Sequence, residues 1–424
     1  MKKNLLLVLT LCLLSFQGIS QEFTLTGEVN ARPEFRNGFK KPILDGQDPA
    51  FFTEQRTRLY FNLKDDKYEV QITLQDVRTW GATRQIYKED NAMFGVVDAW
   101  GKYKFTETFA FKAGRQMISY DNQRYFGGLE WAMQGRRHDA LLFLYEKEGL
   151  KLHFGGAFNQ TQTPFEYAHL TGRDYLGVAN YKHMEYAYLN KKWEKDASIS
   201  LYLVNIASQY GATSDSVASK QTLGLMGMKK LGDLTLNGEF FYQMGDINAT
   251  TELSAMMFSL SGTYKTKVTP ITLGYDYLSG TDSGSDKAGS WNPDFGTNHA
   301  FYGFMDYFYV GNGNSNAGLQ DFYLKTKFKV AGGALLGHVH YFLAAADQDA
   351  YTDKALGTEI DLVYVKKFAP AVTWKLGYSQ MFGTDTMDII KGTPDSSSYQ
   401  SWAWTQIIFK PQLFKSTAKK ESKS

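Results

Sequence analysis

Arginine and glutamate side chains recur at every second position of two segments near the start of the chain, residues 22–36 and 52–64. They are Arg32, Arg36, Glu54, Arg56 and Arg58. A guanidinium group stays charged at any physiological pH and presents a rigid fork of donors that suits carboxylates. A row of such groups, held apart by carboxylates, offers a negatively charged solute a series of weak sites. The spacing therefore predicts recognition of anions.

Further charged side chains extend this set along later segments. Every arginine lies between Arg32 and Arg173, whereas the formal net charge of the chain is only +2, so the basic field is local. We expect a bulge at Val77 to turn Asp76 and Arg78 toward the lumen. The later lining residues are Asp76, Arg78, Asp98, Lys102, Arg115, Arg136 and Asp139. The alternative is that these charges only pair with one another and brace the fold.

The segments that carry these side chains alternate apolar and polar residues. Residues 68–81 read YEVQITLQDVRTWG, and residues 93–105 read MFGVVDAWGKYKF. A period of two sends successive side chains to opposite faces of a sheet. Each run is long enough to cross a bilayer as a tilted strand, which needs about 9–11 residues. One face can then meet lipid while the other meets a water-filled lumen.

The same unit recurs to the end of the chain. Strands are predicted at 22–36, 52–64, 67–79, 93–105, 108–118, 136–147, 149–160, 178–193, 197–208, 219–231, 233–245, 254–266, 270–280, 319–331, 333–346, 355–368, 371–383 and 398–410. Tight turns alternate with longer polar loops, which is typical of outer-membrane barrels with periplasmic turns. We expect an all-β fold: a transmembrane, antiparallel, up-and-down β-barrel of about 18 strands with short periplasmic turns and long extracellular loops. The alternative is a secreted, soluble β-sandwich or propeller.

Three regions follow from the ends of the chain. Residues 1–20 begin with Lys2 and Lys3 and continue into a short apolar core, which predicts a signal peptide. Residues 21–414 form the predicted barrel, and residues 415–424 form a basic tail that we expect to be disordered. The predicted location is the bacterial outer membrane.

The longest predicted loop, 281–318, is too aromatic in its second half to extend freely into water. We expect it to fold over or into the mouth of the pore, where aromatic faces stack on sugar rings. The alternatives are an aromatic rim packed on neighbouring loops and an outward extension of the next strand. The candidate pore-mouth residues are Trp291, His299, Tyr302 and Asp306.

Other clusters of polar residues do not favour catalysis or metal binding. His338 and His340 share one strand face, which supplies two metal ligands and no third. His138 and Asp139 are adjacent without an evident third partner. No nucleophile, phosphate loop or nucleic-acid patch stands out, so we predict no enzyme, no cofactor, no metal and no nucleic-acid partner.

Several motifs resemble the alginate export porin family in its Bacteroidota branch. They are TEQRTRLYF (53–61), LQDVRTWG (74–81), AGRQ (113–116), QGRRHDAL (134–141) and GTNHAFYGFMDYF (296–308). The resemblance implies an eighteen-stranded outer-membrane barrel with an arginine-rich pore for an acidic polysaccharide. It also implies that the selectivity lining includes Arg56, Arg58, Asp76, Arg78, Arg115, Arg136 and Asp139.

We therefore expect an outer-membrane porin for passive, anion-favouring diffusion, or for export of acidic sugars or polysaccharide. The expected partners are small anions or anionic oligosaccharides and polysaccharides, outer-membrane lipid and lipopolysaccharide, and the barrel-assembly machinery. The alternatives are a general small-solute porin, a structural or adhesive barrel, and a hydrolase active at the barrel rim.

Overall fold

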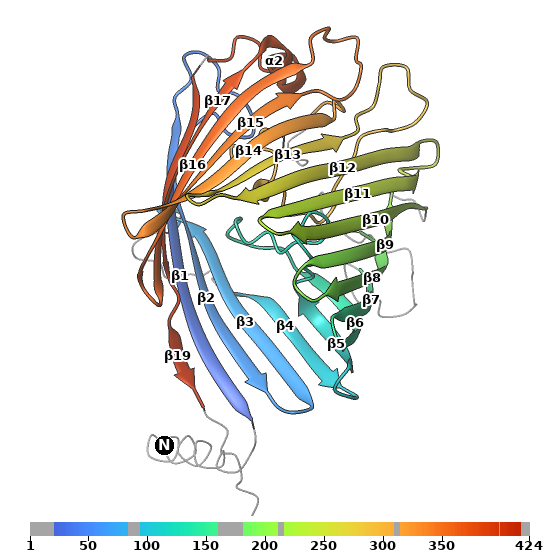
Figure 1. Cartoon of the computed structure of the whole chain (residues 1–424), viewed down its shortest axis with the longest axis vertical. Coiled ribbons are helices and arrows are strands. Elements are labelled where there is room, and N and C mark those ends of the chain that lie inside the picture. The colour runs from blue at the N-terminus through green and yellow to red at the C-terminus, as the bar shows by residue number, and fades with distance from the viewer. Residues whose placement is uncertain are drawn as a thin grey trace, which may run out of the picture.

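The strands of the chain form one sheet that closes on itself. The structure is a computed structural model that describes residues 21–83, 94–159, 181–210, 216–308, 314–397 and 399–416. Each strand pairs with the strands before and after it around the ring seen in Figure 1. β1 pairs with β18 where the circle closes. The predicted signal peptide and most of the predicted tail lie outside the described residues.

The strand bounds match the alternating segments of the sequence closely. In chain order they are β1 (Glu22–Asn37), β2 (Ala50–Lys64), β3 (Tyr68–Thr79), β4 (Gly95–Lys104), β5 (Phe109–Gln116), β6 (His138–Lys147), β7 (Leu150–Phe158), β8 (His183–Trp193), β9 (Ala197–Gln209), β10 (Val217–Leu231), β11 (Leu234–Asp246), β12 (Glu252–Lys265), β13 (Pro270–Leu278), β14 (Leu319–Val330), β15 (Gly333–Leu343), β16 (Ala355–Ala369), β17 (Val372–Gly383), β18 (Gln400–Phe409) and β19 (Gln412–Lys415). The predicted antiparallel barrel is confirmed.

The last strand of the wall is built in two pieces. β18 pairs with β1 between Val29 and Asn37, and β19 pairs with β1 at Thr24, Leu25 and Thr26. Lys410 and Pro411 separate the two pieces, and proline has no N–H to donate to a ladder. The wall therefore has 18 strand positions, the last of which is interrupted at this proline.

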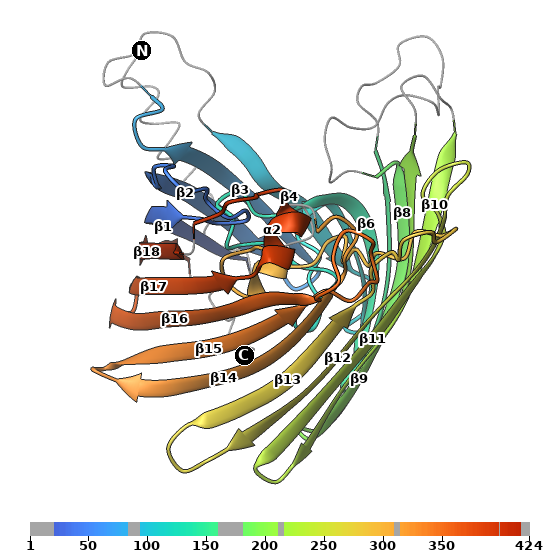
Figure 2. The same cartoon turned by 90° about the horizontal axis from the view of Figure 1, so that it is seen from above.

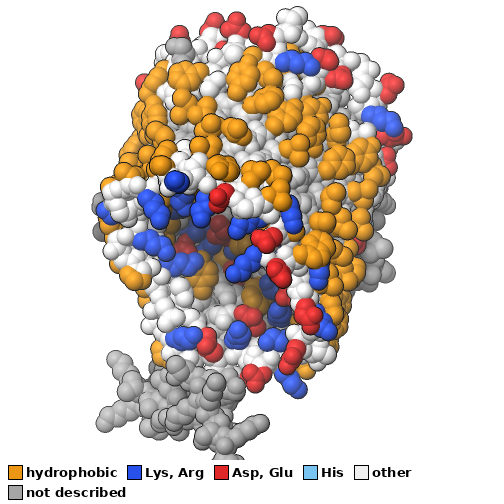
Figure 3. Space-filling view, in the orientation of Figure 1, with side chains coloured by type: hydrophobic (Ala, Val, Ile, Leu, Met, Phe, Trp, Pro, Cys, Tyr) orange, Lys and Arg blue, Asp and Glu red, His pale blue; other side chains and the backbone are white. Residues whose placement is uncertain are grey.

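The outer face of the wall is apolar. Leu203, Leu260 and Leu273 are 56%, 61% and 60% exposed, and hydrophobic side chains cover much of the wall seen in Figure 3. No described helix is long and apolar enough to cross a membrane. A closed barrel pairs every strand edge and can present such a face to lipid without leaving backbone groups unsatisfied. The outer face of this barrel is therefore suited to contact with lipid.

Two long connections fold into the barrel and supply much of its core. The first inner loop (117–137) joins β5 to β6, and the second inner loop (279–318) joins β13 to β14; both lie within the ring of strands seen from above in Figure 2. The two loops meet at Phe126 and Phe295, which form a parallel bridge and whose rings stack at 5.6 Å. Both rings are buried, at 0% and 5% exposed.

Among the described residues, the short helices lie in connections between strands. The 3₁₀ turn η1 (Asn298–Ala300) lies in the second inner loop, and α2 (Asp385–Lys391) joins β17 to β18. The Thr384 hydroxyl caps α2 by accepting from the Met387 N–H, and Gly392 ends the helix in the left-handed conformation, with φ at 62°. Buried Lys391 at its C-terminus donates to Asn314 Oδ1 at 2.7 Å, so the helix is held against the second inner loop.

Candidate functional site

The arginines of β1 face the lumen and are paired with carboxylates. Arg32 donates from Nε to Glu34 Oε1 at 2.7 Å and from Nη2 to Glu54 Oε2 at 2.9 Å. Arg36 donates from Nη2 to Glu34 Oε2 at 2.8 Å. Arg32 and Glu34 are 2% and 0% exposed, so the charges are buried as a neutralised group. The Arg32 guanidinium also lies 4.1 Å from the ring centroid of Trp131 in the first inner loop.

The arginines of β2 are neutralised in the same way. Arg56 donates to Glu28 Oε1 from Nη2 at 2.6 Å and from Nε at 2.8 Å. Arg58 donates to Glu130 Oε2 at 2.6 Å, and Arg137 lies 2.9 Å from the other oxygen of Glu130. Glu130 belongs to the first inner loop, so these ion pairs fix that loop to the wall. The arginines therefore brace the barrel and have little free charge for a solute.

The opposite end of the first inner loop is anchored by Arg124. Its guanidinium donates to Glu239 on β11 at 3.0 Å, to Asp276 on β13 at 2.8 Å and to the Tyr302 hydroxyl at 2.9 Å. Burial opposes the charge, but the carboxylates, Asp276 above all, raise the pKa of Arg124 well above its ordinary value. The first inner loop thus crosses the lumen from the β11–β13 wall to the β1–β2 wall.

Trp131 fixes the first inner loop against the second inner loop and β18. Its ring stacks on His299 at 4.5 Å and meets Trp404 on β18 edge-on at 4.8 Å. His299 Nδ1 in turn lies 2.9 Å from Asp306 Oδ1. The four candidate pore-mouth residues Trp291, His299, Tyr302 and Asp306 are 5%, 9%, 1% and 7% exposed. The second inner loop does fold into the barrel, but these rings pack on protein and leave no aromatic face for a sugar.

Lysines supply the lumenal charge that has no ion-pair partner. Lys102 and Lys112 lie directly opposite each other on the inner face of β4 and β5. Within the described part of the chain, neither they nor Lys325 and Lys375, also on the inner face, have a carboxylate oxygen within 4.0 Å. The Lys112 ammonium lies 3.8 Å from the ring centroid of Trp100.

A cavity of about 390 Å³ opens beside Lys112, between the wall and the first inner loop. Its charged and aromatic lining consists of Arg58, Tyr60, Trp100, Lys112, Arg137 and Lys410, together with Asp98 and Glu130. Figure 3 shows basic and acidic side chains gathered around a hollow in the face of the molecule, framed by the apolar wall. Arg137 donates to Asp98 at 2.5 Å, so here too the arginine is paired.

Asp76 and Arg78 lie on the outer face of the wall, which corrects their predicted lumenal position. The described β2–β3 ladder has no shift at Val77, and it places both residues opposite β2 residues that alternate with the lumenal arginines. Directly opposed residues point to the same side of a sheet. The bulge lies instead on the β3–β4 ladder, between Thr73 and Leu74. Asp76 and Arg78 pair with each other at 2.6 Å.

Arg115 and Asp139 also face outward, contrary to the prediction. They lie opposite each other on β5 and β6 and form an ion pair at 2.8 Å. Asp139 shares its face with Leu141 and Phe143, which are 43% and 42% exposed on the outer wall. Because their side chains are 45% and 59% exposed on that face, Arg115 and Asp139 do not line the lumen.

The other predicted lining residues do lie on the inner side. Arg32, Arg36, Glu54, Arg56, Arg58, Asp98 and Lys102 project from β1, β2 and β4, and Arg136 in the first inner loop donates to the Gly296 carbonyl at 3.0 Å. Their part in selecting a solute stays a prediction. Arg124 and Glu130 were missed because they lie in a loop, and Arg137 was placed in the predicted strand 136–147 although β6 begins at His138. The signal was present, since the sequence around them is as aromatic as the second inner loop.

Comparison with known proteins identifies the fold. No protein-family model matches the sequence, and no curated protein matches it. Among solved structures, OccD3 (OpdP) of Pseudomonas aeruginosa aligns with a TM-score of 0.58 and 13% identity, over 92% of each chain. OccAB1 of Acinetobacter baumannii aligns with a TM-score of 0.58 and 12% identity, over 93% of this chain and 97% of that one. OpdK of P. aeruginosa, solved with vanillate, aligns with a TM-score of 0.56 and 11% identity, over 91% and 98%.

These neighbours are outer-membrane porins of the Occ type, and their likeness shows a shared 18-strand barrel. The resemblance of the motifs to the alginate export family stays a prediction.

Proposed function

We propose that this barrel is a diffusion channel that favours small anionic solutes, with acidic sugars and aromatic carboxylates as the solute class. The proposal rests on the inner face of β4 and β5, where charge and an aromatic ring lie next to open volume.

The observation that carries the proposal is the facing pair Lys102 and Lys112. Like charges directly opposite each other destabilise a sheet. An anion between the two ammonium groups would relieve this repulsion, and no carboxylate oxygen of the described residues lies within 4.0 Å of either. Trp100 beside Lys112 adds a flat apolar surface that suits a sugar or aromatic ring. OpdK, a distant structural neighbour, was solved with the aromatic carboxylate vanillate, which is compatible with this solute class.

The inner loops favour small solutes over a long polymer. Both loops pack across the lumen, and the cavity beside Lys112 measures about 390 Å³, which is in the range that holds one small molecule. Passage of a polysaccharide chain would require the first inner loop to leave its ion pairs with Arg56, Arg58 and Asp276.

Ion selectivity in a planar bilayer tests the proposal. Under a salt gradient, the reversal potential of the wild-type channel should show anion preference. Replacing the facing pair, Lys102→Gln with Lys112→Gln, should lower the anion-to-cation permeability ratio by about 30-fold, since each of the two charges contributes roughly 1 kcal/mol in a wet lumen. Vanillate and galacturonate should reduce the chloride current of the wild type more than that of the double variant.

The matched control replaces two lysines on the outer face, Lys229→Gln with Lys366→Gln, and should leave the reversal potential unchanged. Cation preference in the wild type, or an unchanged ratio in the lumenal double variant, would overturn the proposal. Current block by alginate oligomers that strengthens with chain length would favour polysaccharide export instead.

A structural barrel with a closed lumen is the second candidate, because the inner loops pack from wall to wall. Under that function, the purified protein would insert into bilayers without producing single-channel steps.

A further inference from the structure

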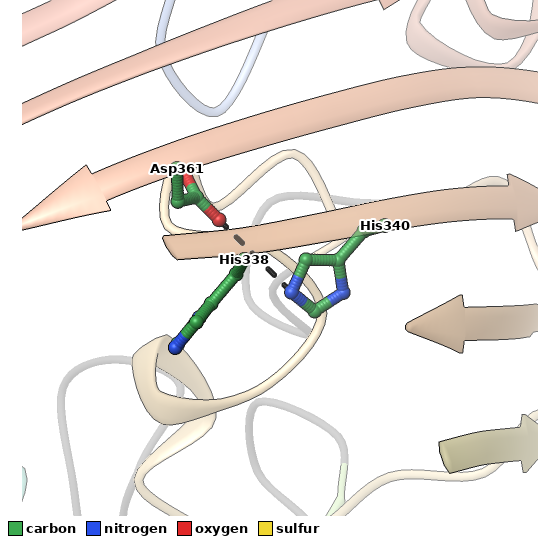
Figure 4. A group of neighbouring side chains, drawn as sticks. All are labelled: His338, His340 and Asp361. Carbon is green, nitrogen blue, oxygen red and sulfur yellow. Dashed lines mark ion pairs between the residues drawn. The ribbon is translucent and has the colours of Figure 1, made fainter. Parts of the chain in front are cut away.

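A cluster of histidine and carboxylate side chains lies on the inner face of β15 and β16, away from the lysine pair. His338 and His340 project from β15, and the ladder places Asp361 of β16 directly opposite His338. One ligand atom from each of the three residues lies within 4.8 Å of the other two, and Figure 4 shows Asp361 and the His340 ring facing each other. The sequence supplied only the two histidines, because the third residue comes from the neighbouring strand.

The hydrogen bonds of His340 determine which of its nitrogen atoms is free. Its Nδ1 lies 2.9 Å from both oxygens of Asp321, so Nδ1 carries the proton and donates it to that carboxylate. Nε2 then presents a lone pair, and it lies 4.0 Å from Asp361 Oδ2. A lone pair and a carboxylate that face each other are placed to share a metal ion as ligands.

Two buried polar atoms in the same wall lack hydrogen-bond partners among the described residues. They are His338 Nδ1 and Glu359 Oε2. Glu359 is two residues from Asp361 on the same face and opposite His340. Buried polar atoms without partners are rare in folded proteins, and a bound ion can satisfy them.

Three buried carboxylates surround the cluster, and Lys325 of β14 lies directly opposite His338. Asp321, Glu359 and Asp361 are 0%, 0% and 1% exposed, and no arginine or lysine in the described part of the chain lies within 4.0 Å of their oxygens. Backbone N–H groups of the second inner loop, Met305 to Glu359 at 2.8 Å and Phe304 to Asp361 at 3.4 Å, offset only part of this charge. A divalent cation would neutralise it directly.

We propose that His338 Nδ1, His340 Nε2 and Asp361 form a binding site for a divalent transition metal of the zinc class. Two imidazoles and one carboxylate are a ligand set that suits zinc, nickel or copper, and a fourth position remains for water or an anion from the lumen. Asp321 acts as a positioning residue, because a carboxylate that accepts from the far nitrogen of a ligating histidine fixes its tautomer and orientation. Bonds of about 2.0–2.2 Å require the three ligand atoms to approach one another by roughly 1 Å, which side-chain rotation allows.

Metal titration of the purified barrel, produced without added histidines and stripped with a chelator, tests the site. Cobalt(II) should bind stoichiometrically and produce the intense visible bands of a tetrahedral complex, and zinc should displace it. His338→Gln removes a ligand that makes no hydrogen bond in the described structure, so the barrel should fold while zinc affinity falls at least about 10-fold. Asp321→Asn should weaken zinc binding by about 10- to 100-fold and alter the cobalt spectrum.

The matched control is His183→Asn, which removes the histidine of an exposed His–Glu pair on the outer face and should leave both affinity and spectrum unchanged. Circular dichroism of each variant reports whether the barrel has formed. Absence of saturable binding in the wild type would overturn the proposal. Unchanged affinity in His338→Gln, or an equal loss in His183→Asn, would also overturn it. Either result is independent of the ion preference of the channel.

Discussion

Burial determines the role of each arginine in this chain. Arg124 is 2% exposed and holds Glu239 and Asp276, which belong to strands far from it in sequence. Arg115 makes an ion pair of similar length with Asp139, but on the outer face and largely exposed. The same side chain therefore joins an inner loop to the wall in one place and contributes little in the other.

Replacing each of these arginines with methionine should separate the two roles. Arg124→Met leaves two carboxylates buried without their cation, and we expect the free energy of unfolding to fall by about 3–5 kcal/mol. Arg115→Met should change it by less than about 1 kcal/mol, because an exposed pair is screened by solvent. Urea unfolding in detergent, followed by tryptophan fluorescence, measures both. Similar losses in the two variants would contradict the outward position of Arg115.

At this scale the sequence contained more information than the prediction used. Asp139 has the same parity as Leu141 and Phe143, so simple alternation already places it with the lipid-facing residues. Asp76 has the parity of Ile72, and only an assumed bulge moved it inward. The position of a residue in the alternation along its strand therefore indicates its face better than its charge does.

The inner loops are the elements that distinguish this barrel from an open ring of strands. The first inner loop is held at Arg124, Glu130 and Trp131, which contact three different parts of the lumen. Because these contacts occupy the cross-section, the loop sets how much of the lumen a solute can use.

Shortening Trp131 should widen the passage. Trp131→Ala removes the ring between Arg32, His299 and Trp404, so the loop keeps the hydrogen bond from Arg32 to the residue 131 carbonyl but loses its ring contacts with the β1–β18 wall. We expect a larger single-channel conductance, or more frequent current fluctuations, at unchanged barrel stability to heat in detergent. Trp80→Ala is the control, because Trp80 is 58% exposed at the end of β3. Equal conductance in both variants would show that the loop does not limit the current.

The strands were predictable and the inner loops were not, for a physical reason. Local alternation is enough to predict a strand such as β2. The predicted strand at 52–64 differs from the observed Ala50–Lys64 only at its start. The position of the first inner loop depends on contacts between residues as distant as Arg124 and Asp276, which are 152 positions apart. No local pattern contains that information. The aromatic content of the loop indicated burial but could not indicate which wall would accept it.

The molecule as a whole relies on the contrast between its two faces. Leucines and aromatic rings cover the outside, while the inside holds ion pairs, the lysine pair and the His–Asp cluster. The closed sheet separates these two environments by the thickness of one strand.

The loss of stability caused by an arginine substitution on the outer face should therefore depend on how deep the residue lies in the membrane. Leu203→Arg, near the middle of β9, should destabilise the folded barrel in a bilayer by about 2–4 kcal/mol. Leu231→Arg, at the periplasmic end of β10, should destabilise it by about 0–1 kcal/mol, because Leu231 lies near the membrane surface. Both side chains are exposed to a similar degree, at 56% and 53%. Reversible folding into lipid vesicles measures the difference, and equal effects would contradict the assigned membrane position.

The interrupted seam has a consequence for biogenesis. β1 precedes the other described strands in the chain, yet its second neighbour is formed by residues around Ile408 and Phe414, about 380 positions later. Until those residues arrive, one edge of β1 has a row of unpaired N–H and C=O groups, which readily pair with another chain. The hairpin of β1 and β2, rather than the final strand, is thus the part whose free edge stays open to wrong pairing for the longest time during folding.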